Sequence, residues 1–227
     1  MTDELEVWNG PVVDSGQSRP VLRRDVQFVG NVWEIVSDVV DFGTSSITRD
    51  IQLHPGAVAI IALDDQERVL LIRQYRHPVG MYLFEPPAGV LDVTGEPARD
   101  TAARELAEEA GLVADEWHVL VDLFNSPGGS SEAIRIYLAR GLHEIAGGRH
   151  RTGEAEEAFL PQAWVDLDEA RALVMSGKVG SPHGVAGVLA AWSSRTIDWS
   201  DLRQADAPWP ARDHLVASDR VFLRPAH

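Results

Sequence analysis

The feature that most constrains the fold is a short acidic segment with helical spacing. The stretch ARELAEEAGL, residues 103–112, places Glu105, Glu108 and Glu109 three and four residues apart, so a helix turns their carboxylates toward one face. Like charges at this spacing destabilise a helix by roughly 0.2–0.5 kcal/mol per pair, so something must offset the repulsion. The opposite face is small or apolar, with Ala103, Leu106, Ala107 and Ala110. Such a helix packs one side on a sheet and offers the other to a ligand.

Strand patterns precede this helix. Residues 26–53 alternate between apolar and polar side chains in short runs, which predicts a small antiparallel meander. Residues 57–76 predict a hairpin of two apolar strands around the turn Asp64–Glu67. Residues 82–89 predict a short strand that ends at Pro86–Pro87, because proline cannot donate a hydrogen bond inside a ladder.

Helices and strands alternate in the second half of the chain. We expect a helix from Pro97 to Ala110 with Gly111 as its C-terminal cap, and a later helix that begins after Ser181–Pro182. The other expected elements are strands at 117–124 and 132–139 and a helix at 166–175. We assign a long loop to 141–159 and no regular structure after Ser200. This order favours an α/β layered domain with an N-terminal β extension.

Composition excludes several classes of partner. The chain of 227 residues has a formal net charge of −15, which disfavours nucleic acid and anionic membranes. No apolar run is long enough to span a membrane, and the segment MTDELEVWNG lacks the features of a secretory signal. The absence of cysteine excludes disulfides and fits a cytoplasmic protein.

The acidic helix face favours a metal site. A solvated face is the ordinary interpretation of a charge run, but the basic residues that would pair along it are missing after Arg104. Mg²⁺ prefers carboxylate oxygens, keeps several waters and bridges substrate phosphates. We therefore expect divalent cations to neutralise the glutamates and to give an anionic diphosphate a place to bind.

The same residues resemble a known family. Gly89, Glu96 and the run from Arg104 to Leu112 resemble the Nudix box, G-x5-E-x7-R-E-U-x-E-E-x-G-U, where U is aliphatic. Six residues rather than five separate Gly89 from Glu96, and we expect the extra residue to shift a loop without moving the glutamates. The resemblance implies an α/β fold, a Nudix α/β/α sandwich with an N-terminal antiparallel β extension. It also implies hydrolysis of nucleoside diphosphates with Mg²⁺, or with Mn²⁺ as the alternative.

The resemblance assigns the metal ligands residue by residue. Glu105 and Glu109 resemble the principal ligands and Glu108 a further one. The carbonyl of Ala88, just before the box glycine, resembles the backbone ligand.

Two further catalytic roles follow from the resemblance. Arg104 is expected to orient the glutamates by charge-assisted hydrogen bonds, with Glu96 as a partner. The general base is expected on the loop GEAEEAF, where Glu157 is favoured and Glu156 is next. The alternative is that these two and Glu154 only solvate the loop.

The flanks of the box indicate the substrate. The motif SPGGSSE, Ser126 to Glu132, places Pro127 fifteen residues beyond the box. It is similar to the ADP-ribose pyrophosphatase subfamily, closest to its actinobacterial members, and residues 48–58 and 71–80 resemble that subfamily too. This resemblance puts Pro127 in the substrate site.

The subfamily resemblance also implies substrate contacts. Arg49 and Arg76 resemble substrate-binding residues, Arg76 near the diphosphate, since the guanidinium fork suits phosphate oxygens. A surface ion pair is the alternative for both. Glu132 resembles a substrate-contacting carboxylate, with a role at a strand edge as the alternative. Trp33 is a candidate to stack on adenine, and a tryptophan in a sheet core fits its position as well.

These expectations combine into one hypothesis. The chain divides into a β-rich extension that mediates dimerisation (1–54), a Nudix hydrolase domain (55–200) and a C-terminal tail (201–227). The implied reaction converts ADP-ribose to AMP and ribose 5-phosphate, in a homodimer whose N-terminal parts are exchanged. The alternatives are another nucleotide sugar or a dinucleotide as the substrate, and a ligand sensor without catalysis.

Overall fold

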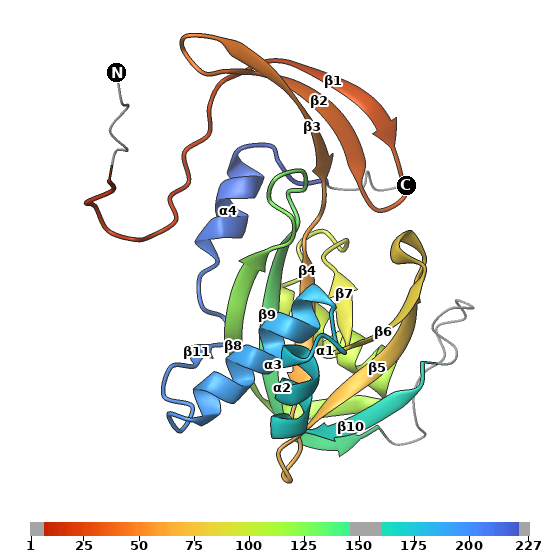
Figure 1. The fold of residues 1–227 in the computed structure, drawn as a ribbon. Coiled ribbons are helices and arrows are strands. Elements are labelled where there is room, and N and C mark those ends of the chain that lie inside the picture. Colours follow the sequence, from red (N-terminus) through yellow and green to blue (C-terminus); the bar gives the residue numbers. More distant parts are fainter. Residues whose placement is uncertain (1–6, 146–159, 223–227) are drawn as a thin grey trace.

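The computed structural model describes residues 7–145 and 160–222, and its first sheet stands apart from the rest of the chain (Figure 1). This sheet contains β1 (Val21–Val29), β2 (Glu34–Asp41) and β3 (Ser46–Leu53), antiparallel in that order. Val36 lies at its centre, opposite Val26 on one side and Ile51 on the other. The predicted meander is confirmed.

A five-stranded sheet forms the middle of the molecule. Its order is β11 (Arg203–Gln204), β8 (Leu112–Phe124), β9 (Ala133–Glu144), β4 (Ala57–Ala62) and β7 (Ala88–Val90). β4 runs parallel to β9, and the other neighbours are antiparallel. β7, which was not predicted, forms one edge and places Ala88 opposite Ala59.

A third sheet corrects the predicted hairpin of residues 57–76. β5 (Arg68–Arg76) pairs with β6 (Met81–Glu85) and β10 (Gln162–Asp166), joined to β6 by the 3₁₀ turn η1 (His77–Val79). The two predicted strands exist, but only the bridge between Leu63 and Val69 joins them. Both edges of β4 are occupied by β9 and β7, so β5 has to pair elsewhere.

Helices begin and end close to the expected residues. They are α1 (Ala98–Glu105), continued by the π-helical turn η2 (Leu106–Ala110), α2 (Leu167–Met175), α3 (Pro182–Arg195) and α4 (Pro210–Ala217). Gly111 ends η2 with φ 70°, and the Ser181 hydroxyl accepts a bond from the N–H of Gly184, as both caps were predicted. Within the described ranges, no helix has the length and apolarity needed to cross a membrane.

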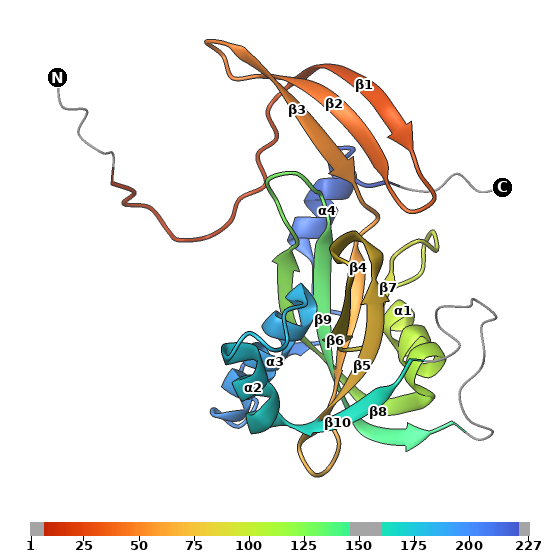
Figure 2. The ribbon, with the colours of Figure 1, turned by 45° about the vertical axis from the view of Figure 1, so that its right-hand side comes forward.

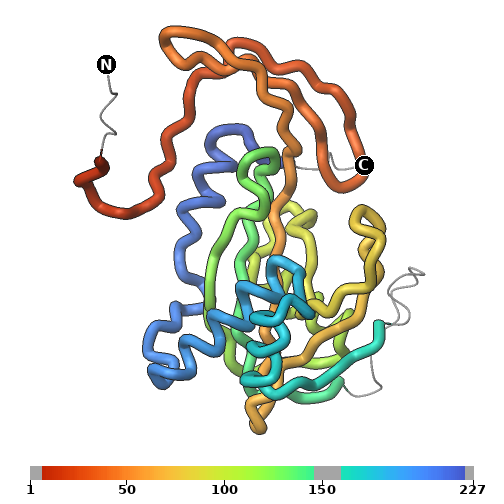
Figure 3. Tube along the Cα trace, viewed as in Figure 1, coloured from red at the N-terminus to blue at the C-terminus, as the bar shows by residue number. Residues whose placement is uncertain are grey.

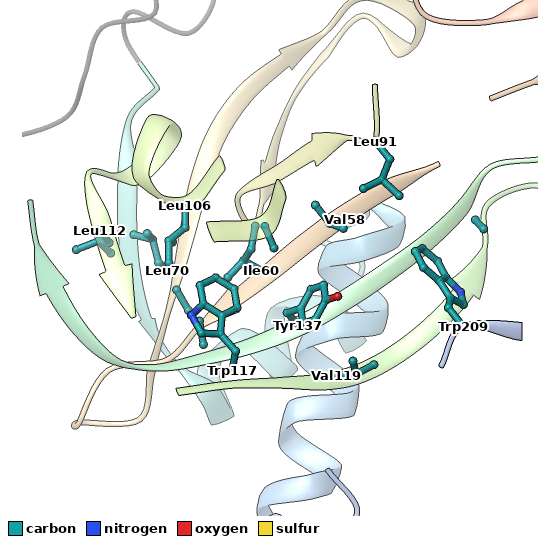
Figure 4. Close-up of a cluster of buried hydrophobic side chains, with 14 of the residues drawn as sticks. Val58, Ile60, Leu70, Leu91, Leu106, Leu112, Trp117, Val119, Tyr137 and Trp209 are labelled. Carbon is teal, nitrogen blue, oxygen red and sulfur yellow. The ribbon is translucent and has the colours of Figure 1, made fainter. Parts of the chain in front are cut away.

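Alternation along β4 creates two hydrophobic layers. Val58 and Ile60 pack with Leu106 on the side of α1 (Figure 4). Ile61 points the other way, toward α3, so closely that a Cβ on Gly187 would lie 2.7 Å from its Cδ1. Figure 2 shows α1 on one side of the central sheet and α2 and α3 on the other. The fold is the expected α/β/α sandwich with an N-terminal β extension.

The prediction of no regular structure after Ser200 is wrong. β11 pairs with β8, and the chain then runs up to α4 beneath the first sheet (Figure 3). Buried Arg135 donates hydrogen bonds to the carbonyls of Ala207 (2.6 Å) and Pro208 (3.0 Å), and its guanidinium lies 4.7 Å from the Trp209 ring centroid. These contacts join distant parts of the chain, so a local pattern of polar residues and prolines does not reveal them.

One arginine connects the first sheet to the C-terminal segment. Arg24 of β1 donates two hydrogen bonds to Asp38, at 2.7 and 2.8 Å, and Asp38 is fully buried. The same guanidinium binds the carbonyl of Asp219 at 2.8 Å and its carboxylate at 3.1 Å. Phe222 packs nearby against Val36 of β2.

We predict that Arg24→Met destabilises the fold strongly. The change leaves the Asp38 carboxylate buried without its cation, which costs on the order of 3–5 kcal/mol of unfolding free energy. The neighbouring Arg23, whose pair with Asp25 is exposed, supplies the control: Arg23→Met is expected to change stability by about 0.5 kcal/mol or less. Urea unfolding measures both, and equal effects would contradict the assignment.

Candidate active site

The acidic helix is less open to solvent than its sequence indicates. The Glu105 side chain is 13% exposed and Glu109 only 5%, while Leu106 is fully buried against the sheet. Glu108 and Glu109 lie in η2, where the helix widens into one π-helical turn. Such turns occur frequently at functional sites, because they re-aim side chains relative to a regular helix. The carboxylates therefore face protein groups as well as solvent.

Glu105 approaches Gly89 closely. A Cβ at position 89 would lie 2.2 Å from the Cδ and Cγ atoms of Glu105, so any larger residue there would force the Glu105 side chain to move. β7 holds the glycine there, since Gly89 pairs with Val58 of β4. The extra residue between Gly89 and Glu96 thus leaves the glycine directly against the first of the three glutamates.

Glu109 is fixed on the same strand. Its Oε2 accepts a hydrogen bond of 2.9 Å from the backbone N–H of Ala88. This bond partly offsets the cost of burying the carboxylate. Ala88, Gly89, Glu105 and Glu109 are therefore brought together from β7, α1 and η2.

Arg104 binds the acidic residues around it. Its guanidinium lies 2.8 Å from Glu105, 3.3 Å from Glu108 and 3.2 Å from Glu96. The hydrogen bond with Glu96 is the main cause that raises the pKa of Arg104 far above its ordinary value, with further contributions from Glu105 and Glu108. Glu96 also accepts a 2.7 Å bond from the Thr101 hydroxyl. One cation thus opposes the mutual repulsion of the glutamates.

The donor set suits a hard divalent cation. Carboxylate oxygens and a strand-edge carbonyl are ligands that Mg²⁺ prefers. Within the described ranges, no three acidic or histidine side chains converge into a complete metal-binding group. Mg²⁺ commonly takes only one or two carboxylates and completes its shell with water and substrate phosphate. The roles of Ala88, Glu105, Glu108 and Glu109 as ligands stay a prediction.

Two predicted substrate residues have defined partners. Arg76, at the end of β5, donates hydrogen bonds of 2.9 and 2.6 Å to one oxygen of Glu85. Glu132 accepts a 2.6 Å bond from the Asn125 amide and lies 3.9 Å from His54.

Trp33 is not a core tryptophan. The residue is 38% exposed, and its ring stacks on the ring of His54 with the two centroids 6.3 Å apart. His54 is buried, and this burial is the main cause that lowers its pKa. Its Nδ1 accepts a hydrogen bond from the N–H of Gly56, which places a neutral ring's proton on Nε2, toward Glu132.

Other predicted residues lie apart or outside the described structure. Arg49 is exposed on β3 and donates only to the neighbouring Thr48 carbonyl among the described residues. Pro127 is exposed in the turn between β8 and β9. The two candidate bases, Glu156 and Glu157, fall outside the described residues.

Sequence reasoning missed the residues that hold these side chains. Glu85, His54 and Asn125 were not identified, although each contacts a predicted substrate residue. A signal existed for Glu85, because a charged residue directly follows apolar side chains in the strand sequence YLFEPP. An ionised carboxylate at such a position requires a partner.

We predict that the Glu96–Arg104 contact stabilises the protein only above acidic pH. The bond from Arg104 is the main cause that lowers the pKa of Glu96 below its ordinary value of 4.5. The stabilisation is therefore fully present above pH 4.5 and is lost as the pH falls through the folded-state pKa. The unfolding temperatures of Glu96→Gln and wild type should differ most near neutral pH. A difference that persists unchanged to pH 3 would contradict a stabilising role for the ionised Glu96.

Comparisons with known proteins show which family the chain resembles. The chain matches the NUDIX domain over residues 53–182. It is 44% identical to the ADP-ribose pyrophosphatase of Mycobacterium tuberculosis, over 79% of this chain and 84% of that protein. It is 34% identical to the methanol dehydrogenase activator of Bacillus methanolicus, over 71% and 85% of the two chains. It is 33% identical to the ADP-ribose pyrophosphatase of Bacillus subtilis, over 67% of this chain and 80% of that protein.

A solved structure supports the fold. The crystal structure of an ADP compounds hydrolase superposes with a TM-score of 0.67 at 22% identity, covering 82% of this chain and 98% of that one. The family match spans more than half of the chain and includes Gly89 and the acidic helix. The chain therefore belongs to the Nudix hydrolase family.

Proposed function

We propose that the protein hydrolyses the diphosphate of ADP-ribose to AMP and ribose 5-phosphate with Mg²⁺, or with Mn²⁺ as the alternative. The observation that carries the proposal is the seating of Glu105 on Gly89 beside Glu109, which gathers carboxylates at the edge strand β7. Two relatives that are at least 33% identical are named ADP-ribose pyrophosphatases, which supports this substrate.

Different residues have different roles in the proposed reaction. Glu105, Glu109 and the Ala88 carbonyl would hold a divalent ion, with Glu108 as a further ligand. When bound, such ions stabilise charge on the phosphoryl oxygens and lower the pKa of an attacking water. Arg76 orients the diphosphate by donating hydrogen bonds to its oxygens. The water gives a proton to the general base, its oxygen bonds to one phosphorus, and the bond from that phosphorus to the bridging oxygen breaks, so that oxygen leaves with the other phosphate.

A substrate panel tests the proposal directly. Purified protein with Mg²⁺ is given ADP-ribose, ADP-sugars, NADH and diadenosine polyphosphates, and AMP release is measured. The highest kcat/KM is expected for ADP-ribose. A different best substrate would favour a nucleotide sugar or dinucleotide hydrolase, and no turnover of any member would favour a ligand sensor.

We also propose a homodimer in the cytoplasm. Val26, Phe28 and Val29 of β1 are each more than half exposed, and an apolar strand exposed in this way fits contact with a second copy. The lack of cysteine fits a reducing compartment. Light scattering in solution measures the mass, and a monomer at micromolar concentration would contradict the dimer.

We predict that Gly89→Ala impairs hydrolysis. The added Cβ would displace the Glu105 carboxylate, so kcat/KM for ADP-ribose should fall by roughly 10- to 100-fold, the scale for disturbing a metal ligand's surroundings. Gly180→Ala is the control, since a Cβ there meets nothing within 4 Å. Wild-type turnover by Gly89→Ala would contradict the proposed role of Glu105.

The proposed general base is Glu157, with Glu156 as the next candidate. Glu157→Gln should lower kcat by roughly 10²–10⁴-fold, because the attacking water loses its proton acceptor. Binding of Mn²⁺, followed by magnetic resonance, should stay close to wild type. Glu154→Gln serves as the control in the same sequence segment, and unchanged turnover by Glu157→Gln would remove this residue from the role.

A further inference from the structure

Glu85 is a buried carboxylate that the proposed reaction leaves without a role. It ends β6, three residues before Ala88, and is 2% exposed. Burying an ionised carboxylate is unfavourable unless charged or polar partners surround it. The partners of Glu85 therefore indicate what the residue does.

The first partner is Arg76. In the β5–β6 pair, Arg76 lies opposite Met81 and Glu85 lies opposite Ile72, so the Arg76 side chain spans four residues along the strands to reach Glu85. Its Nε and Nη2 both donate to Oε2 of Glu85, at 2.9 and 2.6 Å. Among the described residues, Nη1 and the second N–H of Nη2 have no hydrogen-bond acceptor. The side chain is 39% exposed, so these donors remain available to an anion.

The second partner holds Glu85 from the opposite side. Nε2 of His183, near the start of α3, lies 3.8 Å from the same Oε2, a contact too long for a hydrogen bond. A carboxylate near a helix N-terminus is also stabilised by the helix dipole. Burial opposes ionisation of Glu85, but the contacts with His183 and Arg76 outweigh it and hold its pKa below the ordinary value. Glu85 is thus an anion at neutral pH.

We propose that Glu85 is a positioning residue that fixes the Arg76 guanidinium for the substrate diphosphate. The inference rests on the proposed function, in which Arg76 contacts that diphosphate. Two bonds to one buried oxygen restrict a long and otherwise mobile side chain. Its remaining N–H donors then meet phosphate oxygens with less loss of conformational freedom on binding.

The sign of the effect distinguishes positioning from simple neutralisation. A carboxylate beside Arg76 weakens the arginine's attraction for an anion, so removing it should tighten substrate binding if charge alone matters. If Glu85 orients the guanidinium, removing it should weaken binding. A purely structural role would lower the unfolding temperature and leave the affinity for substrate unchanged.

The experiment uses Glu85→Ala, Glu85→Gln and Arg76→Ala in the full-length chain. Glu85→Ala should raise KM for ADP-ribose by roughly tenfold, the scale of a lost charge-assisted hydrogen bond, with kcat within about twofold of wild type. Glu85→Gln keeps an acceptor oxygen and should raise KM less. Binding of the non-hydrolysable α,β-methylene analogue of ADP-ribose, measured by calorimetry, should follow the same order.

Two controls separate positioning from general damage. Glu67, in the turn directly before β5, also accepts a hydrogen bond from an arginine, Arg140, at 2.6 Å, so Glu67→Gln and Glu67→Ala should leave KM unchanged. The double variant Glu85→Ala/Arg76→Ala should match Arg76→Ala alone, because Glu85 acts only through that arginine. Unfolding temperatures are measured for every variant, and Glu85→Gln provides the conservative change if Glu85→Ala folds poorly.

The outcomes separate the two levels of the proposal. If wild type does not hydrolyse ADP-ribose, the proposed function fails and the inference fails with it. If Arg76→Ala raises KM but both Glu85 variants leave KM unchanged or lower it, only the inference fails. If Arg76→Ala leaves KM unchanged while the wild type is active, Arg76 is not a substrate contact and the positioning role is overturned.

Discussion

The site depends on one arginine placed among carboxylates. Arg104 lies within 3.3 Å of Glu96, Glu105 and Glu108, in a chain whose formal net charge is −15. Without a shared cation, the acidic side chains would repel one another and the first turn after α1 would tend to unwind. The guanidinium suits this place, because its planar arrangement of N–H groups serves several carboxylates at once. The acidic face is thus held together by the protein's own charges.

Backbone geometry then sets how the carboxylates lie. β4 is covered on both faces, and its pairing with β7 places Ala88 and Gly89 beneath α1 and η2. Glu105 occupies the space that a side chain at position 89 would fill, and Glu109 accepts the hydrogen bond from the N–H at position 88. The strand edge is therefore as much a part of the site as the helix, although only the helix carries charged residues.

Local features of the site and fold were predictable, and long-range pairings were not. Gly111, Ser181 and the alternation in residues 26–53 act over a few residues, so the sequence pattern was enough. The Glu105–Gly89 contact was not predicted, although both residues belong to the family motif. The partners of β5, the helix α4 and the Glu85–Arg76 bond depend on segments that meet only after folding. Hydrophobic periodicity and helix-cap residues carry no information about contacts between segments that are distant in the sequence.

The bond between Arg24 and Asp219 has a consequence for the order in which the molecule forms. The two residues are 195 positions apart, so during translation the first sheet emerges long before its C-terminal partner exists. Domains generally fold as units from the N-terminal side while synthesis continues. The β1–β3 sheet and the sandwich can each acquire their own pairing on the ribosome, but this link between them closes only after residue 219 has been made. Until then, Trp33 and the sheet that carries it remain unanchored by Asp219 to the rest of the enzyme.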